Sequence, residues 1–180
     1  GVGFTGKSRT KLGYRTDCLG VTSLGPIALD PAGGDVASLQ TNVYSTAKPF
    51  HNLSVPGSKS TTLLFAGYGN PANGSGNFNP FFTRMAANPI TSSVINDAVA
   101  SNPTFFSIQV GEQDILEYAL TGATSGTMTP ANGSAGIGFD GTVEATILAL
   151  KANGAKGVIG NVPDITKFPY FNTIPYNGLN

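Results

Sequence analysis

Few residues of this chain could carry acid–base or nucleophilic chemistry. His51 is the only histidine and Cys18 the only cysteine, so a Cys/His zinc cluster and an internal disulfide are both excluded. A Ser-His-Asp triad within the chain would have to use His51, although a lone histidine is more often structural. Glu112 and Asp114 could form a carboxylate pair, but Asp114 is better explained as the N-cap of a helix. No cofactor or metal is predicted.

Residues 1–8, Gly-Val-Gly-Phe-Thr-Gly-Lys-Ser, match the glycine-rich loop that binds nucleotide phosphates. Such a loop needs a buried strand before it and a helix after it, so that backbone N–H groups converge on the phosphate. Residues 9–14 have no apolar stripe and contain the helix-weakening Gly13. We therefore favour a glycine-rich surface loop over nucleotide binding.

The elements that must position a site lie in the second half of the chain. Val143, Ile147 and Leu150 recur at the spacing of one helix face. The order strand, helix, loop, helix, strand predicts a right-handed crossover and a parallel sheet, with the site at the carboxyl ends of its strands. The predicted fold class is α/β, with a parallel sheet flanked by helices. The sheet formed by this chain alone can be incomplete. Helices are predicted at 92–100, 115–120 and 142–152, and strands at 104–110 and 157–161.

Length and composition limit the classes of protein. The 180 residues are read as one α/β domain or a segment of one, in which 1–50 form a loop-rich insertion with short strands and 51–180 form the core. Only 11% of residues are charged, and ten basic residues balance ten acidic ones, which argues against a nucleic-acid partner. No apolar run approaches the ~20 residues of a transmembrane helix.

Three segments, in order, resemble the middle of an SGNH, or GDSL-type, ester hydrolase. They are Asn-Leu-Ser-Val-Pro-Gly at 52–57, Asn-Pro-Thr-Phe-Phe-Ser-Ile-Gln-Val-Gly-Glu-Gln-Asp-Ile-Leu-Glu-Tyr-Ala at 102–119, and Asn-Gly-Ala-Lys-Gly-Val-Ile-Gly-Asn-Val-Pro-Asp at 153–164. The third segment and residues 168–176 are similar to a secreted bacterial branch of that family. The resemblance covers about residues 52–176 and implies a three-layer, flavodoxin-like fold.

The resemblance implies a serine nucleophile, a glycine N–H and an asparagine amide that form the oxyanion hole, and a late Asp-x-x-His. Gly57 matches the glycine, and Gly111-Glu-Gln-Asp114 occupies the Gly-x-Asn-Asp block. Gln113 thus stands at the asparagine place, where its extra methylene would shift the amide by about 1 Å, and loss of such a donor costs about 10²–10³ in rate. Asp114 would orient the loop.

The departures from the family pattern concern the catalytic residues themselves. Gly34-Asp35 is followed by Val36 instead of serine, and neither Asp-x-x-His nor Gly-x-Ser-x-Gly occurs. The chain is then either an interior segment of a longer hydrolase or a descendant that lost the chemistry, and we favour the segment. The central strand of the sheet would come from residues 1–50 or from another chain, with Gly57 and Gln113 within about 12 Å of each other.

The resemblance implies that the parent protein is an extracytoplasmic serine ester hydrolase: secreted, periplasmic or a surface-anchored lipoprotein. Its substrate would be an ester of a small molecule, a lipid or a carbohydrate, hydrolysed through an acyl-enzyme. The isolated chain is expected to be inactive because it lacks the triad. The alternative is a non-catalytic binding or structural module on the same fold.

Overall fold

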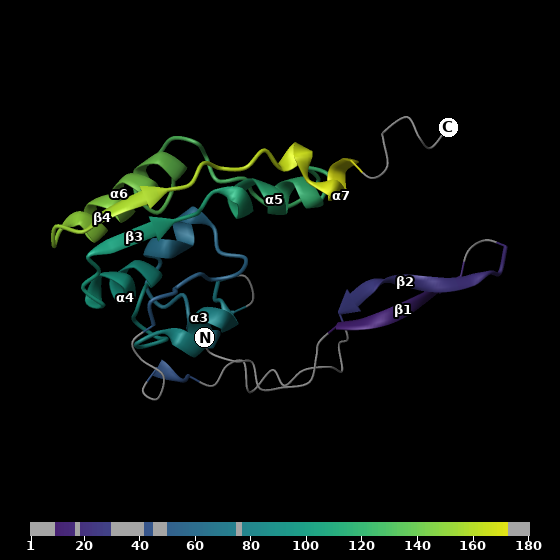
Figure 1. Ribbon diagram of the computed structural model, residues 1–180, viewed down its shortest axis with the longest axis horizontal. Coiled ribbons are helices and arrows are strands. Elements are labelled where there is room, and N and C mark those ends of the chain that lie inside the picture. Colours follow the sequence, from purple (N-terminus) through teal and green to yellow (C-terminus); the bar gives the residue numbers. More distant parts are fainter. Residues whose placement is uncertain (1–9, 17–18, 30–41, 45–49, 75–76, 173–180) are drawn as a thin grey trace. The chain divides into compact units, whose positions relative to one another are not determined.

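The computed structural model describes residues 10–16, 19–29, 42–44, 50–74 and 77–172 (Figure 1). The chain divides into two compact units, residues 1–41 and 42–180. The glycine-rich motif at residues 1–8, Cys18 and the Gly34-Asp35 dipeptide lie outside the described residues.

The first unit contains an antiparallel hairpin of β1 (Thr10–Thr16) and β2 (Thr22–Leu29). The register shifts between Leu12 and Tyr14, which pair with Ile27 and Leu24, so Gly25 and Pro26 lie opposite the single Gly13. One additional residue on one strand is a β-bulge. This bulge interrupts the two-residue period and explains why strands of seven and eight residues look irregular in the sequence.

The second unit is mixed α/β, with a two-stranded parallel sheet and helices packed against it. Strand β3 (Phe105–Ile108) pairs with β4 (Lys156–Ile159), in register from Phe105 opposite Lys156 to Ile108 opposite Ile159. The two arrows lie side by side in Figure 1. The predicted parallel pairing is confirmed, and both strands are shorter than predicted.

The three predicted helices are present with changed boundaries. They are α4 (Val94–Ala100), α5 (Glu112–Leu120) and α6 (Phe139–Lys151). The Ser93 side chain caps α4 by accepting from the Asn96 N–H. The helix α4 ends at Ala100, as expected from the Asn102-Pro103 dipeptide, but Asn102 takes a left-handed φ of 50° instead of the extended conformation that a following proline favours.

The predicted role of Asp114 as an N-cap is wrong. The helix α5 begins at Glu112 with Gly111 as its N-cap, and Asp114 lies in its first turn with a side chain that is 3% exposed. Gly111 has a φ of +112°, and a Cβ there would overlap the Val162 side chain. This turn lets α5 start after the three residues that follow β3, and Asp114 in its first turn is buried.

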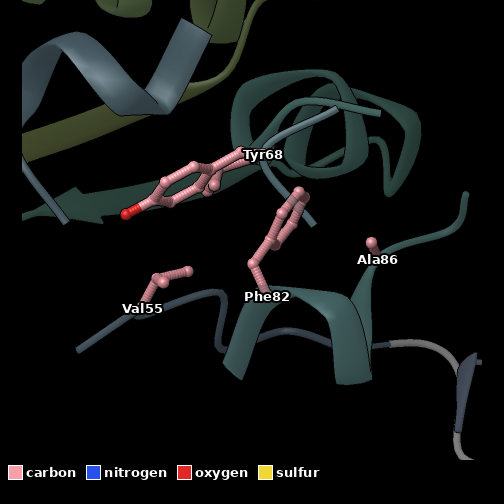
Figure 2. Close-up of a cluster of buried hydrophobic side chains, with 5 residues drawn as sticks. Val55, Tyr68, Phe82 and Ala86 are labelled. Atoms are coloured by element: carbon pink, nitrogen blue, oxygen red, sulfur yellow. The ribbon is translucent and has the colours of Figure 1, made fainter. Parts of the chain in front are cut away.

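A hydrophobic core is built from residues that precede the parallel sheet in sequence. It is formed by Val55, Tyr68, Phe82, Ala86 and Val94. Phe82, from α3 (Pro80–Met85), is completely buried and stacks on Tyr68 with ring centroids 6.1 Å apart. Figure 2 shows the Phe82 ring between Tyr68 and Ala86, with Val55 below the Tyr68 ring.

Short elements complete this unit. They are the 3₁₀-helices η1 (Ser60–Leu64), η2 (Pro71–Asn73) and η3 (Ile165–Lys167), and the helix α7 (Pro169–Asn172). Among the described residues, no helix has the length and apolar character needed to cross a membrane.

Candidate functional site

A groove of about 800 Å³ runs beside β3. Two stretches of backbone line it, residues 50–58 and residues 105–113, and α4 and α6 contribute Val94, Ile95, Thr146 and Leu150. Both Gly57 and Gln113 are among the lining residues. The structure therefore brings the two sequence-predicted oxyanion residues to one groove.

Gly57 occupies a tight turn that follows residues 52–55, which belong to no helix or strand. Its φ is +76°, a conformation that favours glycine, and a Cβ there would meet nothing within 4 Å. The turn is closed by the Ser58 N–H, which donates to Val55 O at 3.2 Å. Asn79 supports it from the core side, because its Nδ2 donates to Pro56 O at 2.8 Å.

Gln113 is half-buried in the first turn of α5, which follows β3 directly after the turn at Gly111. In the part of the chain that the structure describes, neither the Gly57 N–H nor the Gln113 side-chain amide has a hydrogen-bond partner. The groove is thus lined by two residues with donors that have no hydrogen-bond partner among the described residues. Their separation of less than about 12 Å stays a prediction.

Asp114 and Ser60 connect the two donors' segments. The Ser60 N–H donates to Asp114 Oδ2 at 2.9 Å, and the Ser60 hydroxyl donates to Asp114 Oδ1 at 2.6 Å. Beside them, Lys59 forms an ion pair with Glu117 at 2.6 Å and donates to Thr127 O at 2.9 Å. The start of η1, just after Gly57, is therefore attached to the first two turns of α5.

The other sequence candidates are not brought together as catalytic groups. His51 is exposed at the groove, and no carboxylate of the described ranges is hydrogen-bonded to it. Both carboxylate oxygens of Asp114 accept bonds from Ser60, so Asp114 does not form an acid–base pair with Glu112. Within the described residues, no three His, Cys, Asp or Glu side chains cluster closely enough to hold a metal ion.

Thr146 is a groove residue that sequence reasoning missed. Its side chain is 2% exposed, and its hydroxyl is buried without a partner among the described residues. The apolar stripe of Val143, Ile147 and Leu150 predicts the buried face of α6, but the buried residues of this helix are Thr142, Thr146 and Leu150. In the sequence, only the four-residue spacing of Thr142 and Thr146 could have indicated that they share a helix face. The apolar stripe of the neighbouring face was the stronger pattern.

Scans against protein-family models, curated proteins and solved structures found no match to this chain. The structure itself shows an α/β unit with one parallel strand pair among the described residues, and a groove that Gly57 and Gln113 both line.

Proposed function

We propose that this chain supplies the oxyanion-binding part of an extracytoplasmic serine ester hydrolase of the SGNH type, with a three-layer α/β fold. The observation that carries the proposal is that the Gly57 N–H and the Gln113 amide, both unpaired among the described residues, line one groove. The serine and the Asp-x-x-His pair would come from polypeptide outside residues 1–180. The substrate would be an ester of a small molecule, a lipid or a carbohydrate.

The proposed roles follow from the chemistry of acyl transfer. The serine Oγ would bond to the ester carbonyl carbon, and the carbonyl oxygen would gain negative charge. Donors placed before the reaction stabilise that charge at little reorganisation cost. The intermediate would then collapse, the alcohol would leave, and water would hydrolyse the acyl-enzyme. Gly57 and Gln113 would bind the oxyanion, and Asp114 would hold their segments together through Ser60.

A non-catalytic binding or structural module is the second candidate. It is favoured by the lack of a Gly-Asp-Ser block and of Asp-x-x-His in these 180 residues. The longer Gln113 in place of asparagine and the exposed His51, which no described carboxylate contacts, point the same way. Such a module would use the groove for binding alone.

Labelling of the natural polypeptide distinguishes the two candidates. An antibody against this chain would recover that polypeptide from its producer, and a fluorophosphonate probe would then react with any activated serine. We expect a labelled serine outside residues 1–180. An unlabelled polypeptide of 18.4 kDa would contradict the hydrolase and support the binding module.

Substitution in the labelled polypeptide then tests the oxyanion role. Gln113→Ala should lower kcat by about 10²–10³ with little change in KM, because the donor acts on charge formed in the transition state. Gln109→Ala is the matched control, since the Gln109 amide already donates to Asn161 O at 3.0 Å. Equal kcat values for the two variants would show that the Gln113 amide does not bind the oxyanion.

A further inference from the structure

A second pocket, of about 310 Å³, adjoins the groove and shares three lining residues with it. Most of its lining, among the described residues, is apolar or aromatic: Tyr44, Phe50, Leu53, Met85 and Ala100. The two polar lining residues are Asp97 and Ser101. Small-molecule sites have volumes of about 300–1,000 Å³. The pocket therefore has the size and the mainly apolar lining of a site for a small ligand.

Two aromatic residues of this pocket lie close to each other. The ring centroids of Tyr44 and Phe50 are 6.1 Å apart, and the ring planes are inclined by 41°. The face of an aromatic ring attracts a cation that lies within about 6 Å of the ring centroid. Because the two centroids are so close, one cation can interact with both rings.

The charge of the pocket comes from Asp97, which is the one charged residue of its described lining. Asp97 is half-buried, and its Oδ2 accepts the Ala87 N–H at 2.8 Å. Its Oδ1 has no hydrogen-bond or ion-pair partner among the described residues. A carboxylate that is partly removed from water is stabilised by a positive charge beside it. The charge of the pocket thus complements a cation and repels an anion.

Hydrogen bonds fix the aromatic side of the pocket before any ligand binds. Asn42 Nδ2 donates to Thr83 O at 2.9 Å and to Ala86 O at 2.8 Å, at the end of α3. Tyr44 N donates to Asn42 Oδ1 at 3.0 Å. The backbone of Tyr44 is therefore attached to the helix that contributes Met85. A site that is already ordered loses less conformational entropy when a ligand binds.

The lining favours a quaternary ammonium group over a primary one. A primary ammonium has three N–H donors that need acceptors, and the acceptors in this lining are few. A quaternary ammonium has no N–H group, and its methyl groups can pack against Leu53, Met85 and Ala100. Aromatic residues combined with apolar and acidic ones are the means by which proteins recognise such groups.

We propose that this pocket binds a small quaternary ammonium ion, for which choline is the probe. The positive charge lies beside the Asp97 carboxylate and within reach of the Tyr44 and Phe50 rings. The binding uses neither a nucleophile nor an oxyanion donor. It is therefore independent of the hydrolase proposal.

Titration of the 180-residue chain with choline chloride tests the proposal. With the total chloride held constant by sodium chloride, the NMR signals of Tyr44 and Asp97 should shift saturably with a Kd of about 0.1–1 mM, as two cation–π contacts and one carboxylate imply. In the neutral isostere dimethylbutanol, a carbon replaces the charged nitrogen, and it should bind at least about tenfold more weakly. Equal affinities, or no saturable shift up to about 50 mM choline, would overturn the proposal. This comparison requires no variant to fold.

A variant of Asp97 tests the role of the carboxylate. Asp97→Asn removes the charge, while the amide oxygen can still accept the Ala87 N–H, and choline binding should weaken at least about fivefold. Asp140→Asn is the matched control, because Asp140 also accepts backbone N–H groups, from Gly133 and Gly141, and does not line the pocket. It should leave the affinity within about twofold. An equal loss in both variants would assign the effect to net charge and overturn the proposal.

Variants of Phe50 test the role of the ring. Phe50→Leu should weaken choline binding about fivefold or more, and Phe50→Tyr should retain most of the affinity because the ring remains. Phe65→Leu is the control: Phe65 also belongs to an aromatic pair, with Tyr68 at 6.4 Å, but it lines neither the pocket nor the groove. Equal affinities of the two leucine variants would show that the Phe50 ring does not contact the cation, which would contradict the proposal.

The chain's own ammonium group is the competing occupant. Lys48 lies between Tyr44 and Phe50 in the sequence and outside the described residues. Lys48→Gln should leave choline binding within about twofold. Choline binding that occurs only in Lys48→Gln would show that the pocket takes this lysine instead of a free ion, and it would overturn the proposal.

Discussion

The carboxylate of Asp114 accepts both the backbone N–H and the hydroxyl of Ser60, at 2.9 and 2.6 Å. Both residues are buried. Asp114 follows Gln113 directly, and Ser60 is three residues beyond Gly57. The relative position of the two groove donors therefore depends on this pair.

Asp114→Ala should lower the free energy of unfolding by about 3 kcal/mol or more, because each buried donor left unpaired costs about 1–3 kcal/mol. Glu117→Ala is the control. It breaks only the Lys59 ion pair, whose glutamate side chain is 50% exposed, and should cost less than about 1 kcal/mol. Urea unfolding of both variants measures the difference. Equal losses would mean that the Asp114 bonds contribute nothing beyond a surface interaction.

Phe82→Ala should lower the free energy of unfolding by about 3–5 kcal/mol, because this ring is completely buried against Tyr68. Phe105→Ala removes the same atoms from a side chain that is 61% exposed, and its effect should stay within about 0.5 kcal/mol. Thermal unfolding of the two variants checks the contrast. A large loss from Phe105→Ala would show that this ring is covered in solution.

Gly111→Ala should destabilise the chain more than Gly122→Ala. Gly122 has a φ of +63° with open space around a Cβ, so only the left-handed conformation is penalised, by about 1–2 kcal/mol. At Gly111 a Cβ would also overlap Val162 and come within 3.0 Å of the Phe139 ring, which adds about 1–3 kcal/mol. Chemical denaturation measures both values, and the reverse order would contradict the close packing of Val162 and Phe139 against this turn.

Asp164 should titrate below its ordinary value of 3.8, because the Thr166 side chain and then the Thr166 backbone N–H hydrogen-bond to its carboxylate and lower its pKa. A lowered folded-state pKa means that the contribution to stability is present above the unfolded value and is lost as pH falls through the folded value. Thr166→Val should raise the pKa of Asp164 toward 3.8. Carbon-detected NMR titration measures it, and an unchanged pKa would assign the shift to other groups.

The purified 180-residue chain should show no measurable hydrolysis of a short-chain aryl ester, since no serine block or Asp-x-x-His is present. The oxyanion donors alone should leave at most a weak residual effect. Turnover that follows the protein through purification would contradict this expectation if it disappeared in His51→Ala or in a serine variant. A continuous spectrophotometric assay at high protein concentration measures it.

Several elements of the fold could be predicted because their signals are local. The stripe of Val143, Ile147 and Leu150 indicated α6, and the Asn102-Pro103 dipeptide indicated where α4 ends. The parallel pairing of β3 and β4 followed from the order of elements, since a strand that returns through helices is almost always parallel to its partner.

The roles of individual polar residues could not be predicted in this way. A cap was the local explanation for Asp114, but its partner is Ser60, which is distant in sequence. Spacing alone does not tell whether Thr146 is exposed or buried, and only the packing of α6 buries its hydroxyl without a partner among the described residues.

By itself, the sequence determined the approximate places of α4, α5 and α6 and of the parallel strands β3 and β4, because short-range patterns act within a few residues. Only the tertiary structure decided that Gly57 and Gln113 line one groove and that β3, among the described residues, keeps an unpaired edge there. Those relationships depend on which faces of distant segments meet, and that is set by packing of the whole unit instead of by the residues next to each position.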